Sequence, residues 1–326
     1  MKEILLIAPS FYGYYKKISD SMEKKGYKVR WYDDQIEQTY VTKFERKFLP
    51  NKFYEKMYSY IKTIISKNNN NFEYVILILG YDIPEKAISL LRERYKTSRF
   101  IYYTWDSVNT YPHILKLTPF FDKVFSFDDE DCAKYSFELL PLFCSKVLDK
   151  NKISFKYDYS TVMSYFPNKD KNIKTILKSV PSGSKAYLHL YVKSKTYYCY
   201  LWLRYRKKMS VKMKDISFNK LTSDQTYNLF CSSKAVIDCP IVEQKGLTMR
   251  TFEVLGNGIK LITTNSNIKK YNFYTPDNVF VADGETKIPK TFFETPYNYD
   301  YCLGEQYSLD SFVDTLLGRY HGSYLR

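Results

Sequence analysis

The sequence predicts an α/β chain of two doubly wound domains that face each other across a cleft. Its 326 residues are too many for one ordinary domain and suit two. Solidly apolar segments alternate with helical patterns, which is typical of parallel strands covered by helices on both faces. The alternation breaks at 146–160, where the chain is charged and low in hydrophobicity, and then starts again.

The first half alternates regularly between strands and helices. Loops at the carboxyl ends of parallel strands are where such sheets bind ligands, so the loops 8–15, 80–85, 103–109 and 126–131 are of interest. Apolar runs predict strands at 3–10, 28–34, 74–80, 99–107 and 123–128, and helical patterns cover 11–27, the stretch up to about residue 66, 83–95 and 130–138.

The second half repeats the alternation. Strands are expected at 185–192, 215–218, 234–240, 260–264 and 278–283, and helices at 194–209, 223–233 and 307–320. Ser223 or Asp224 is the expected cap of the helix at 223–233. The predicted domains are therefore 1–150 and 151–305, with a C-terminal helix in 306–326 that can cross back to the first domain.

The amino-acid composition limits the classes of binding partner and the cellular compartment that we expect for the protein. The net charge of +15 favours anionic partners of any kind, whether nucleic acid, phosphorylated small molecules or an anionic membrane face. Six scattered cysteines without a CxxC pair, together with only three histidines, argue against a zinc site and fit a reducing cytosol. No apolar window approaches the ~20 residues that cross a bilayer, and the N-terminal run is too short for a signal peptide. We therefore expect a cytoplasmic protein, either soluble or peripheral at the inner face of the cell membrane.

The stretch GLTMRTFEVLGNGIKLITTN, 246–265, has the pattern of a nucleotide site. A glycine leads into a short helix, and unpaired N–H groups at a helix start favour phosphate. Gly246, Leu247 and Thr248 lie where those donors are expected, and Arg250 in the first turn can bind the same phosphate. One turn later, Glu253 can accept hydrogen bonds from ribose hydroxyls. The alternative is an Arg250–Glu253 pair that only stabilises the helix.

The order strand, loop, glycine, helix with glutamate, glycine, strand resembles the second half of GT-B glycosyltransferases. The chain is also similar to glycosyltransferases encoded in bacterial capsule and lipopolysaccharide O-chain clusters. The likeness covers most of the chain, is weakest between about 150 and 215, and is carried by IYYTWDSVN, FDKVFSFDDEDCAKYSFELLPLF, SKAVID and GLTMRTFEVLGNGIKLITTNSNIKKYNFY.

The resemblance implies the GT-B fold, with an acceptor side at 1–150 and a donor side at 151–305. It implies that Glu253 binds the ribose, that 246–248 face the diphosphate, and that Arg250 is a side-chain donor. Family members often have an earlier glutamate that contacts the donor sugar; here that position is Lys245, with Glu243 the nearest acid, so the sugar contact stays open. GT-B enzymes need no metal at the diphosphate, and we expect neither a metal nor another cofactor.

A base that activates the acceptor hydroxyl is expected in the first domain. Asp106 is the first candidate, because Trp105 beside it can stack on a sugar and help to desolvate the carboxylate. Asp82 is the second. Both can instead be helix or loop caps. In the first loop, Phe11, Tyr12 and Gly13 are candidate acceptor contacts, with aromatic packing as the alternative.

Two further stretches carry more than one interpretation. The acidic run at 128–131 contains a D-x-D pattern, but it lies where a helix is expected to begin, and acids there are favoured by the helix dipole. The aromatic and basic stretch 193–214 suits a membrane interface, or it is a core helix with a solvated basic end. Within it, Lys193 and Lys195 can reach the donor diphosphate.

We therefore expect a metal-independent GT-B glycosyltransferase, a hexosyl- or related transferase. It would move a sugar from a nucleotide-sugar donor to a growing, lipid-linked bacterial surface polysaccharide, in capsule or O-antigen biosynthesis. Two alternatives are a non-catalytic nucleotide-sugar-binding module and a basic nucleic-acid-binding protein; the lack of an RNA-binding aromatic signature argues against the second.

Overall fold

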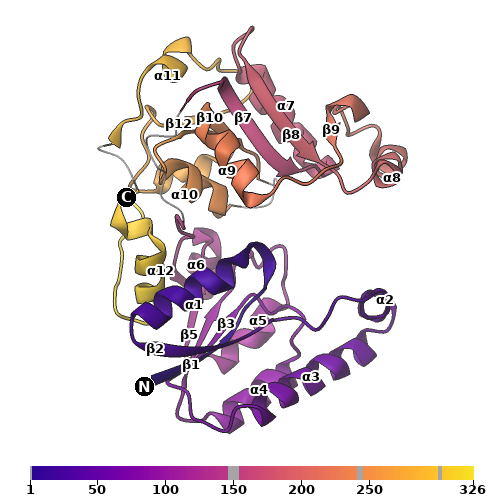
Figure 1. The fold of residues 1–326 in the computed structure, drawn as a ribbon, viewed down its shortest axis with the longest axis vertical. Coiled ribbons are helices and arrows are strands. Elements are labelled where there is room, and N and C mark those ends of the chain that lie inside the picture. The colour runs from indigo at the N-terminus through magenta and orange to yellow at the C-terminus, as the bar shows by residue number, and fades with distance from the viewer. Residues whose placement is uncertain (1, 146–153, 241–244, 300–302) are drawn as a thin grey trace. The chain divides into compact units, whose positions relative to one another are not determined.

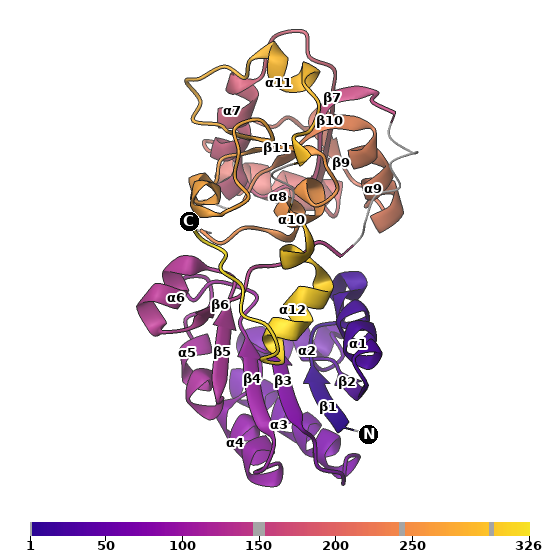
Figure 2. The ribbon, with the colours of Figure 1, turned by 90° about the vertical axis from the view of Figure 1, so that its left-hand side faces the viewer.

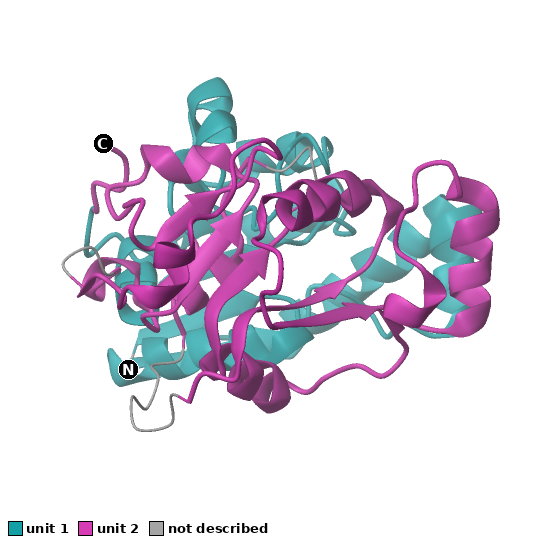
Figure 3. Cartoon of the chain, turned by 90° about the horizontal axis from the view of Figure 1, so that it is seen from above, with its two compact units in different colours: residues 1–141, 309–321 teal, residues 142–308, 322–326 magenta. Residues whose placement is uncertain are grey.

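The computed structural model describes residues 2–145, 154–240, 245–299 and 303–326. The chain forms two compact units, residues 1–141 with 309–321 and residues 142–308 with 322–326, which Figure 3 shows in different colours. The predicted boundary between residues 150 and 151 lies outside the described residues. Helix α12 (Leu309–Leu316) belongs to the first unit, although it lies in sequence between residues 142–308 and 322–326 of the second unit.

The first unit is built on a parallel six-stranded sheet in the order β2-β1-β3-β4-β5-β6 (Figure 2). Because β1 pairs with both β2 and β3, the strand order reverses between β1 and β3. Ligands of open α/β sheets bind at the carboxyl ends of strands beside such a reversal. The strands are β1 (Lys2–Ile7), β2 (Tyr27–Tyr32), β3 (Tyr74–Ile78), β4 (Arg99–Tyr103), β5 (Lys123–Ser126) and β6 (Glu138–Leu139).

Helices cover both faces of this sheet (Figure 1). Alternate residues of the strands, such as Leu5, Val75 and Phe100, form one buried cluster with apolar residues of α3, α4 and α5. On the other face, α1 and α12 pack together, and Phe312 of α12 contacts the ring of Tyr103. The helices are α1 (Tyr14–Lys24), α2 (Tyr40–Phe48), α3 (Pro50–Ser66), α4 (Glu85–Arg94), α5 (Ile114–Leu117) and α6 (Asp129–Tyr135).

The second unit has a second parallel six-stranded sheet, in the order β12-β11-β10-β7-β8-β9. Its reversal lies between β7 and β10, which pair with each other. Its elements are β7 (Tyr157–Ser164), α7 (Asp170–Ser179), β8 (Ala186–Tyr191), α8 (Lys195–Tyr205), β9 (Ile216–Ser217), α9 (Ser223–Cys231), β10 (Ser233–Asp238), α10 (Met249–Leu255), β11 (Lys260–Thr263), β12 (Val279–Val281) and α11 (Lys290–Glu294).

The main error of the sequence prediction is β7, which it assigned in part to the charged break at 146–160. This strand is central, yet its sequence YDYSTVMS is not a continuous apolar run. Two of its buried residues are polar and are satisfied by β10: Ser233 Oγ donates to Ser160 Oγ at 2.7 Å, and Thr161 Oγ1 donates to the carbonyl of Ile237 at 2.9 Å. Apolar periodicity cannot detect a strand whose inward side chains hydrogen-bond to a neighbouring strand.

The start of α9 also differs from the prediction. The cap is Thr222, not Ser223 or Asp224. Thr222 Oγ1 accepts a hydrogen bond from Gln225 N at 3.1 Å, and Gln225 Oε1 accepts one from Thr222 N at 2.9 Å. This reciprocal arrangement is a capping box, in which one threonine and one glutamine satisfy two otherwise unpaired N–H groups.

No helix among the described residues is both long enough and apolar enough to cross a membrane.

The cap assignment predicts a difference between two neighbouring substitutions. Thr222→Ala removes the side-chain acceptor and should lower the free energy of unfolding by about 1 kcal/mol. Ser223→Ala is the matched control and should change it by less than about 0.5 kcal/mol, as expected for a surface position. Urea denaturation of both variants measures the difference. Equal effects, or a larger effect at Ser223, would contradict the assignment.

Candidate functional site

In the second unit, the candidate donor residues follow the carboxyl end of β10, next to the strand reversal. Asp238 ends β10 and is 3 % exposed. Its carboxylate accepts hydrogen bonds from Thr248 Oγ1 at 2.6 Å and Thr251 Oγ1 at 3.2 Å, and forms an ion pair with Arg250 at 3.2 Å. Arg250 also donates to the carbonyl of Val162 in β7. One buried carboxylate therefore fixes the start of α10 against the end of the sheet.

A second cation lies beside Arg250. Lys169 follows β7, on the other side of the strand reversal, and its backbone carbonyl lies 3.8 Å from Cys239 Sγ. Burial lowers the pKa of the Lys169 amine, and repulsion by the Arg250 guanidinium lowers it further. Among the described residues at these strand ends, the two neighbouring cations share one carboxylate, that of Asp238, which leaves excess positive charge that an anion such as a diphosphate can neutralise.

Glu253 lies one turn into α10 and is half-buried, whereas Thr251, Phe252, Val254 and Leu255 of the same helix are buried. Its Oε1 accepts a hydrogen bond from Ser145 Oγ at 3.2 Å. The side chain therefore remains at the surface of the unit rather than in its core, as a residue that binds a ribose must. Arg250 pairs with Asp238, so the predicted alternative, in which its partner is Glu253, is not needed to explain its position.

The loop before α10 is held by the end of β11. Asn265 Nδ2 donates to the carbonyls of Lys245 at 2.9 Å and Gly246 at 3.4 Å. Leu247 is buried, and Thr248 is the residue before the helix. The predicted diphosphate loop 246–248 thus has a fixed path. Glu243, the nearest acid to the expected sugar contact, lies outside the described residues.

Lys193 and Lys195 follow β8, the strand next to β7 on the side away from β10. Both are exposed. The Lys193 ammonium lies 4.3 Å from the centre of the Tyr197 ring, and Lys195 begins α8. The structure therefore places them at a neighbouring strand end, and not in the cluster formed by Asp238, Lys169 and Arg250.

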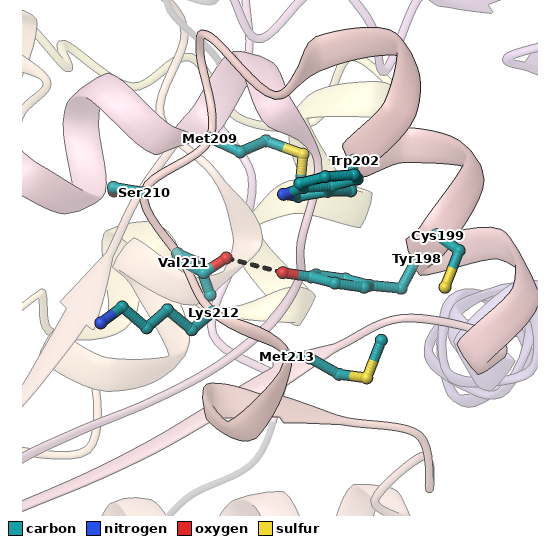
Figure 4. A pocket seen from close by; sticks show the side chains of 8 residues that line it. All are labelled: Tyr198, Cys199, Trp202, Met209, Ser210, Val211, Lys212 and Met213. Atoms are coloured by element: carbon teal, nitrogen blue, oxygen red, sulfur yellow. Dashed lines mark hydrogen bonds between the residues drawn. The ribbon is translucent and has the colours of Figure 1, made fainter.

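The rest of the stretch 193–214 forms α8 and the segment after it. Tyr198 and Leu201 are buried, while Tyr200, Trp202 and Leu203 are exposed. A cavity of about 460 Å³ lies between α8 and the following segment, and Figure 4 shows the rings of Trp202 and Tyr198 together with Met209 and Met213 around it. Tyr198 Oη donates to the carbonyl of Val211 at 2.9 Å and thereby closes the segment onto the helix. The cavity is lined mainly by aromatic rings and thioethers.

In the first unit, the predicted acceptor contacts lie together at the end of β1. The ring of Phe11 contacts Tyr12 at 5.7 Å and Trp105 at 6.3 Å between centroids. Phe11 and Tyr12 are exposed, whereas Trp105 is largely buried. Tyr12 and Trp105 both have φ of 55°, and Gly13 has φ of 68°. Left-handed backbone is unfavourable for bulky residues and is concentrated at functional sites, so this aromatic cluster is a candidate sugar-binding surface.

Asp106 lies at the end of β4, half-buried, and accepts a hydrogen bond from Tyr81 Oη. Tyr81 stacks on Tyr111 with ring centroids 4.0 Å apart. Burial raises the pKa of Asp106, and the Tyr81 hydroxyl opposes this rise. The backbone N–H of Val108 is instead capped by Asp131, at 2.8 Å. Asp106 therefore does not cap the backbone N–H of Val108, and its carboxylate is held by the Tyr81 hydroxyl.

Asp82, the second candidate base, does not cap α4, because that helix has Pro84 before it and no side-chain cap. It forms an ion pair with Arg46 of α2 at 3.0 Å. Burial raises its pKa, and Arg46 opposes the rise. Its neighbour Asp34 is also buried and accepts a hydrogen bond from Gly80 N at 3.0 Å. Burial raises the pKa of Asp34 to about 7.

The acidic run at 128–131 is the start of α6, as predicted. Asp128 is its cap and accepts from Glu130 N at 3.1 Å. In the described ranges, no cluster of three or more histidines, cysteines, aspartates or glutamates has the arrangement of a metal site.

Sequence reasoning missed four residues that organise these sites: Asp238, Lys169, Asp34 and Tyr81. Asp238 ends β10 and Asp34 follows β2, and a position at the carboxyl end of a strand is the signal that pointed to Asp82 and Asp106. Lys169 follows β7, which was itself missed, so no signal was available for it.

No known family model matches the sequence, and no curated protein matches it. Solved structures do resemble the chain. HepE of Anabaena in complex with UDP-glucose has a TM-score of 0.61 at 9 % identity, covering 98 % of this chain and 99 % of that one. AviGT4, a glycosyltransferase involved in avilamycin A biosynthesis, has a TM-score of 0.56 at 10 % identity, with all of both chains covered. A UDP-GlcNAc 2-epimerase from Neisseria meningitidis bound to UDP-GlcNAc has a TM-score of 0.51 at 8 % identity, covering 98 % and 100 %.

These likenesses extend over the full chain and confirm the predicted fold class: two doubly wound α/β units with parallel six-stranded sheets, as in GT-B proteins.

The raised pKa of Asp34 predicts a pH dependence of stability. An unfolded aspartate has a pKa of about 3.9, so between about pH 4 and 7 the folded state holds a proton that the unfolded state has lost. The contribution is complete below pH 4 and is lost as the pH rises through 7. Asp34→Asn keeps an acceptor for Gly80 N–H but cannot titrate.

The free energy of unfolding of wild type, measured by urea denaturation from pH 4.5 to 8, should therefore fall more steeply than that of Asp34→Asn. Asp82 and Asp106 are present in both proteins, so only the difference between the two profiles reports on Asp34. Parallel profiles would contradict the assignment.

Proposed function

We propose that the protein is a glycosyltransferase that moves a sugar from a nucleotide-sugar donor to an acceptor bound by the first unit. The observation that carries this proposal is the pair of cations, Lys169 and Arg250, at the strand reversal of the second unit. This is the position where doubly wound sheets bind phosphorylated ligands. Structures with the same fold contain UDP-glucose and UDP-GlcNAc, which supports a nucleotide sugar as the ligand.

In this proposal, the second unit stabilises the departing nucleoside diphosphate. Negative charge develops on the diphosphate as the glycosidic bond breaks, and fixed cations stabilise it without rearranging. Asp238 holds Arg250 in one orientation but also offsets its charge. Lys169 supplies the additional positive charge that the diphosphate needs. Glu253, half-buried in α10, binds the ribose hydroxyls. No metal is required for these roles.

The first unit would activate the acceptor hydroxyl. Asp106 is the proposed base, because burial raises its pKa towards the range in which a carboxylate both remains ionised and accepts protons well. Tyr81 orients its carboxylate. The exposed rings of Phe11 and Tyr12, beside Trp105, would bind the acceptor sugar by stacking.

We infer that the acceptor is a growing, lipid-linked surface polysaccharide of the capsule or O-antigen type, and that the protein works in the cytoplasm at the inner membrane face. Exposed Tyr200, Trp202 and Leu203 on α8, with six cations between residues 204 and 214, support a membrane contact by the second unit. The apolar cavity beside α8 suits an aliphatic chain.

A second candidate function is epimerisation of a nucleotide sugar, since an epimerase bound to UDP-GlcNAc shares the fold. The two functions differ in their need for an acceptor, because an epimerase changes the donor alone. A non-catalytic nucleotide-sugar-binding module would bind the same ligand without any turnover. A nucleic-acid-binding protein would bind generic RNA in a salt-sensitive way and would not saturate with a nucleoside diphosphate.

The proposal predicts distinct effects at two acids. Glu253→Gln should weaken nucleoside diphosphate affinity by about 10- to 100-fold, because it removes charged hydrogen bonds worth about 1.5–3 kcal/mol. Asp106→Asn should preserve that affinity and lower kcat by about 10²- to 10⁴-fold. Glu294→Gln, at an exposed glutamate of α11 in the same unit as Glu253, is the control and should change neither.

Thermal shift with UDP, GDP, TDP and CMP first selects the nucleotide, since a ligand of the folded state raises its melting temperature. Calorimetry and a radiolabelled-donor transfer assay then measure affinity and turnover. Full turnover in both variants would show that the site is misassigned. Donor conversion that needs no acceptor would favour the epimerase.

A further inference from the structure

Helix α2 of the first unit has no role in the proposed reaction. It exposes its apolar side and buries a charged residue, the reverse of an ordinary surface helix. A surface helix normally buries its apolar residues and exposes its charges. Along α2, the only buried residue is Glu45, which is 2 % exposed, while Tyr40 is 94 %, Phe44 56 % and Phe48 58 % exposed. Val41 and Leu49 extend this apolar face.

Ion pairs fix the orientation of α2, with its aromatic side exposed. Glu45 is held by Lys52 at 3.0 Å and by Lys56 at 2.5 Å, both on α3. These two lysines hold the pKa of Glu45 below its usual range. Arg46, the next residue, pairs with Asp82 at 3.0 Å. The helix therefore cannot turn its aromatic face inward without breaking three ion pairs.

The exposed rings form one continuous surface. Residues 40, 44 and 48 recur at four-residue steps, and Val41 lies three residues before Phe44, so the four lie on one side of the helix. The rings of Phe44 and Phe48 lie 4.9 Å apart, and Lys47 lies 5.0 Å from the centre of the Phe48 ring. Figure 1 shows α2 at the margin of the first unit, on the side away from α12. Contiguous exposed aromatics of this kind mark an interaction surface.

The two charges on α2 that have no ion-pair partner among the described residues are positive, and the exposed Glu37 precedes the helix. Lys43 and Lys47 are exposed, and neither forms an ion pair with a described residue. The two acids of the α2–α3 segment are already engaged, Glu45 with the lysines of α3 and Glu55 with Lys86. Aromatic side chains flanked by unpaired lysines suit an interface with apolar depth and anionic headgroups, and the net charge of +15 has the same sign.

We propose that α2 is a membrane-docking helix that inserts Tyr40, Phe44 and Phe48 into an anionic phospholipid surface, with Lys43 and Lys47 at the headgroups. The inference rests on the membrane location in the proposed function and adds a contact on the first unit, and its test needs neither donor nor turnover. Because Arg46 joins the helix to Asp82, docking would hold the carboxyl edge that carries Asp82 and Asp106 close to the lipid surface.

Vesicle flotation of the full chain tests this inference without any substrate. Wild type should bind vesicles of phosphatidylcholine and phosphatidylglycerol (3:1) and bind pure phosphatidylcholine more weakly. Phe44→Ser with Phe48→Ser should weaken binding to the mixed vesicles at least tenfold. The matched control is Phe155→Ser with Phe166→Ser, two phenylalanines of the second unit that are 57 % and 44 % exposed, and it should bind like wild type.

Lys43→Gln with Lys47→Gln should remove most of the preference for the anionic vesicles. Melting temperatures close to that of wild type exclude misfolding as the cause of any loss. Three results would overturn the inference: wild type that does not float, a Phe44/Phe48 variant that floats like wild type, or binding that is lost only when Trp202 and Leu203 of α8 are replaced by serine. Sedimentation equilibrium without lipid gives a further test. A dimer of the wild type that Phe44→Ser with Phe48→Ser dissociates would assign the exposed side of α2 to a second copy of the chain, and would also overturn the inference.

Discussion

The second unit depends on the buried carboxylate of Asp238. A charge that is 3 % exposed is costly unless it is fully paired, and here two threonine hydroxyls and one guanidinium pair it. All three donors come from one short segment, so satisfying the charge fixes Thr248, Arg250 and the start of α10 in one geometry. The same network places Arg250 beside Lys169 across the strand reversal. In the proposed function, stability and anion binding therefore rest on the same atoms.

The first unit uses the same principle at its own strand ends. Asp34, Asp82 and Asp106 follow β2, β3 and β4, and burial raises the pKa of each. Each is restrained by one specific partner: Gly80 N–H, Arg46 or Tyr81. Parallel strands bring such residues to one edge because all their carboxyl ends point the same way. The edge thus collects carboxylates that retain protons more readily than free aspartate.

Sequence reasoning predicted the fold class because the central strands β1, β3, β4, β10 and β11 are largely buried on both faces and are therefore rich in apolar residues. It failed at β7, where Ser160 and Thr161 replace apolar contacts by hydrogen bonds to β10. It predicted Glu253 one turn into a short helix, and Phe11, Tyr12 and Trp105 in loops at the carboxyl ends of strands. It missed Asp238, although a residue at a strand end was a usable signal, and Lys169, because β7 before it was missed. It predicted a helical stretch that covers α2 but not its exposed aromatic side, because the apolar side of an amphipathic helix is normally the buried one.

If Lys169 and Arg250 together form a diphosphate site, the pKa of the Lys169 amine must respond to the ligand. NMR of the labelled lysine side chains, with Lys169→Arg to assign the signal, gives this pKa with and without UDP. We expect this pKa to lie below the usual ~10.4 in the free protein and to rise when UDP binds, because the diphosphate charge offsets the repulsion by Arg250. UDP that binds without changing the pKa of Lys169 would contradict this assignment of the diphosphate site.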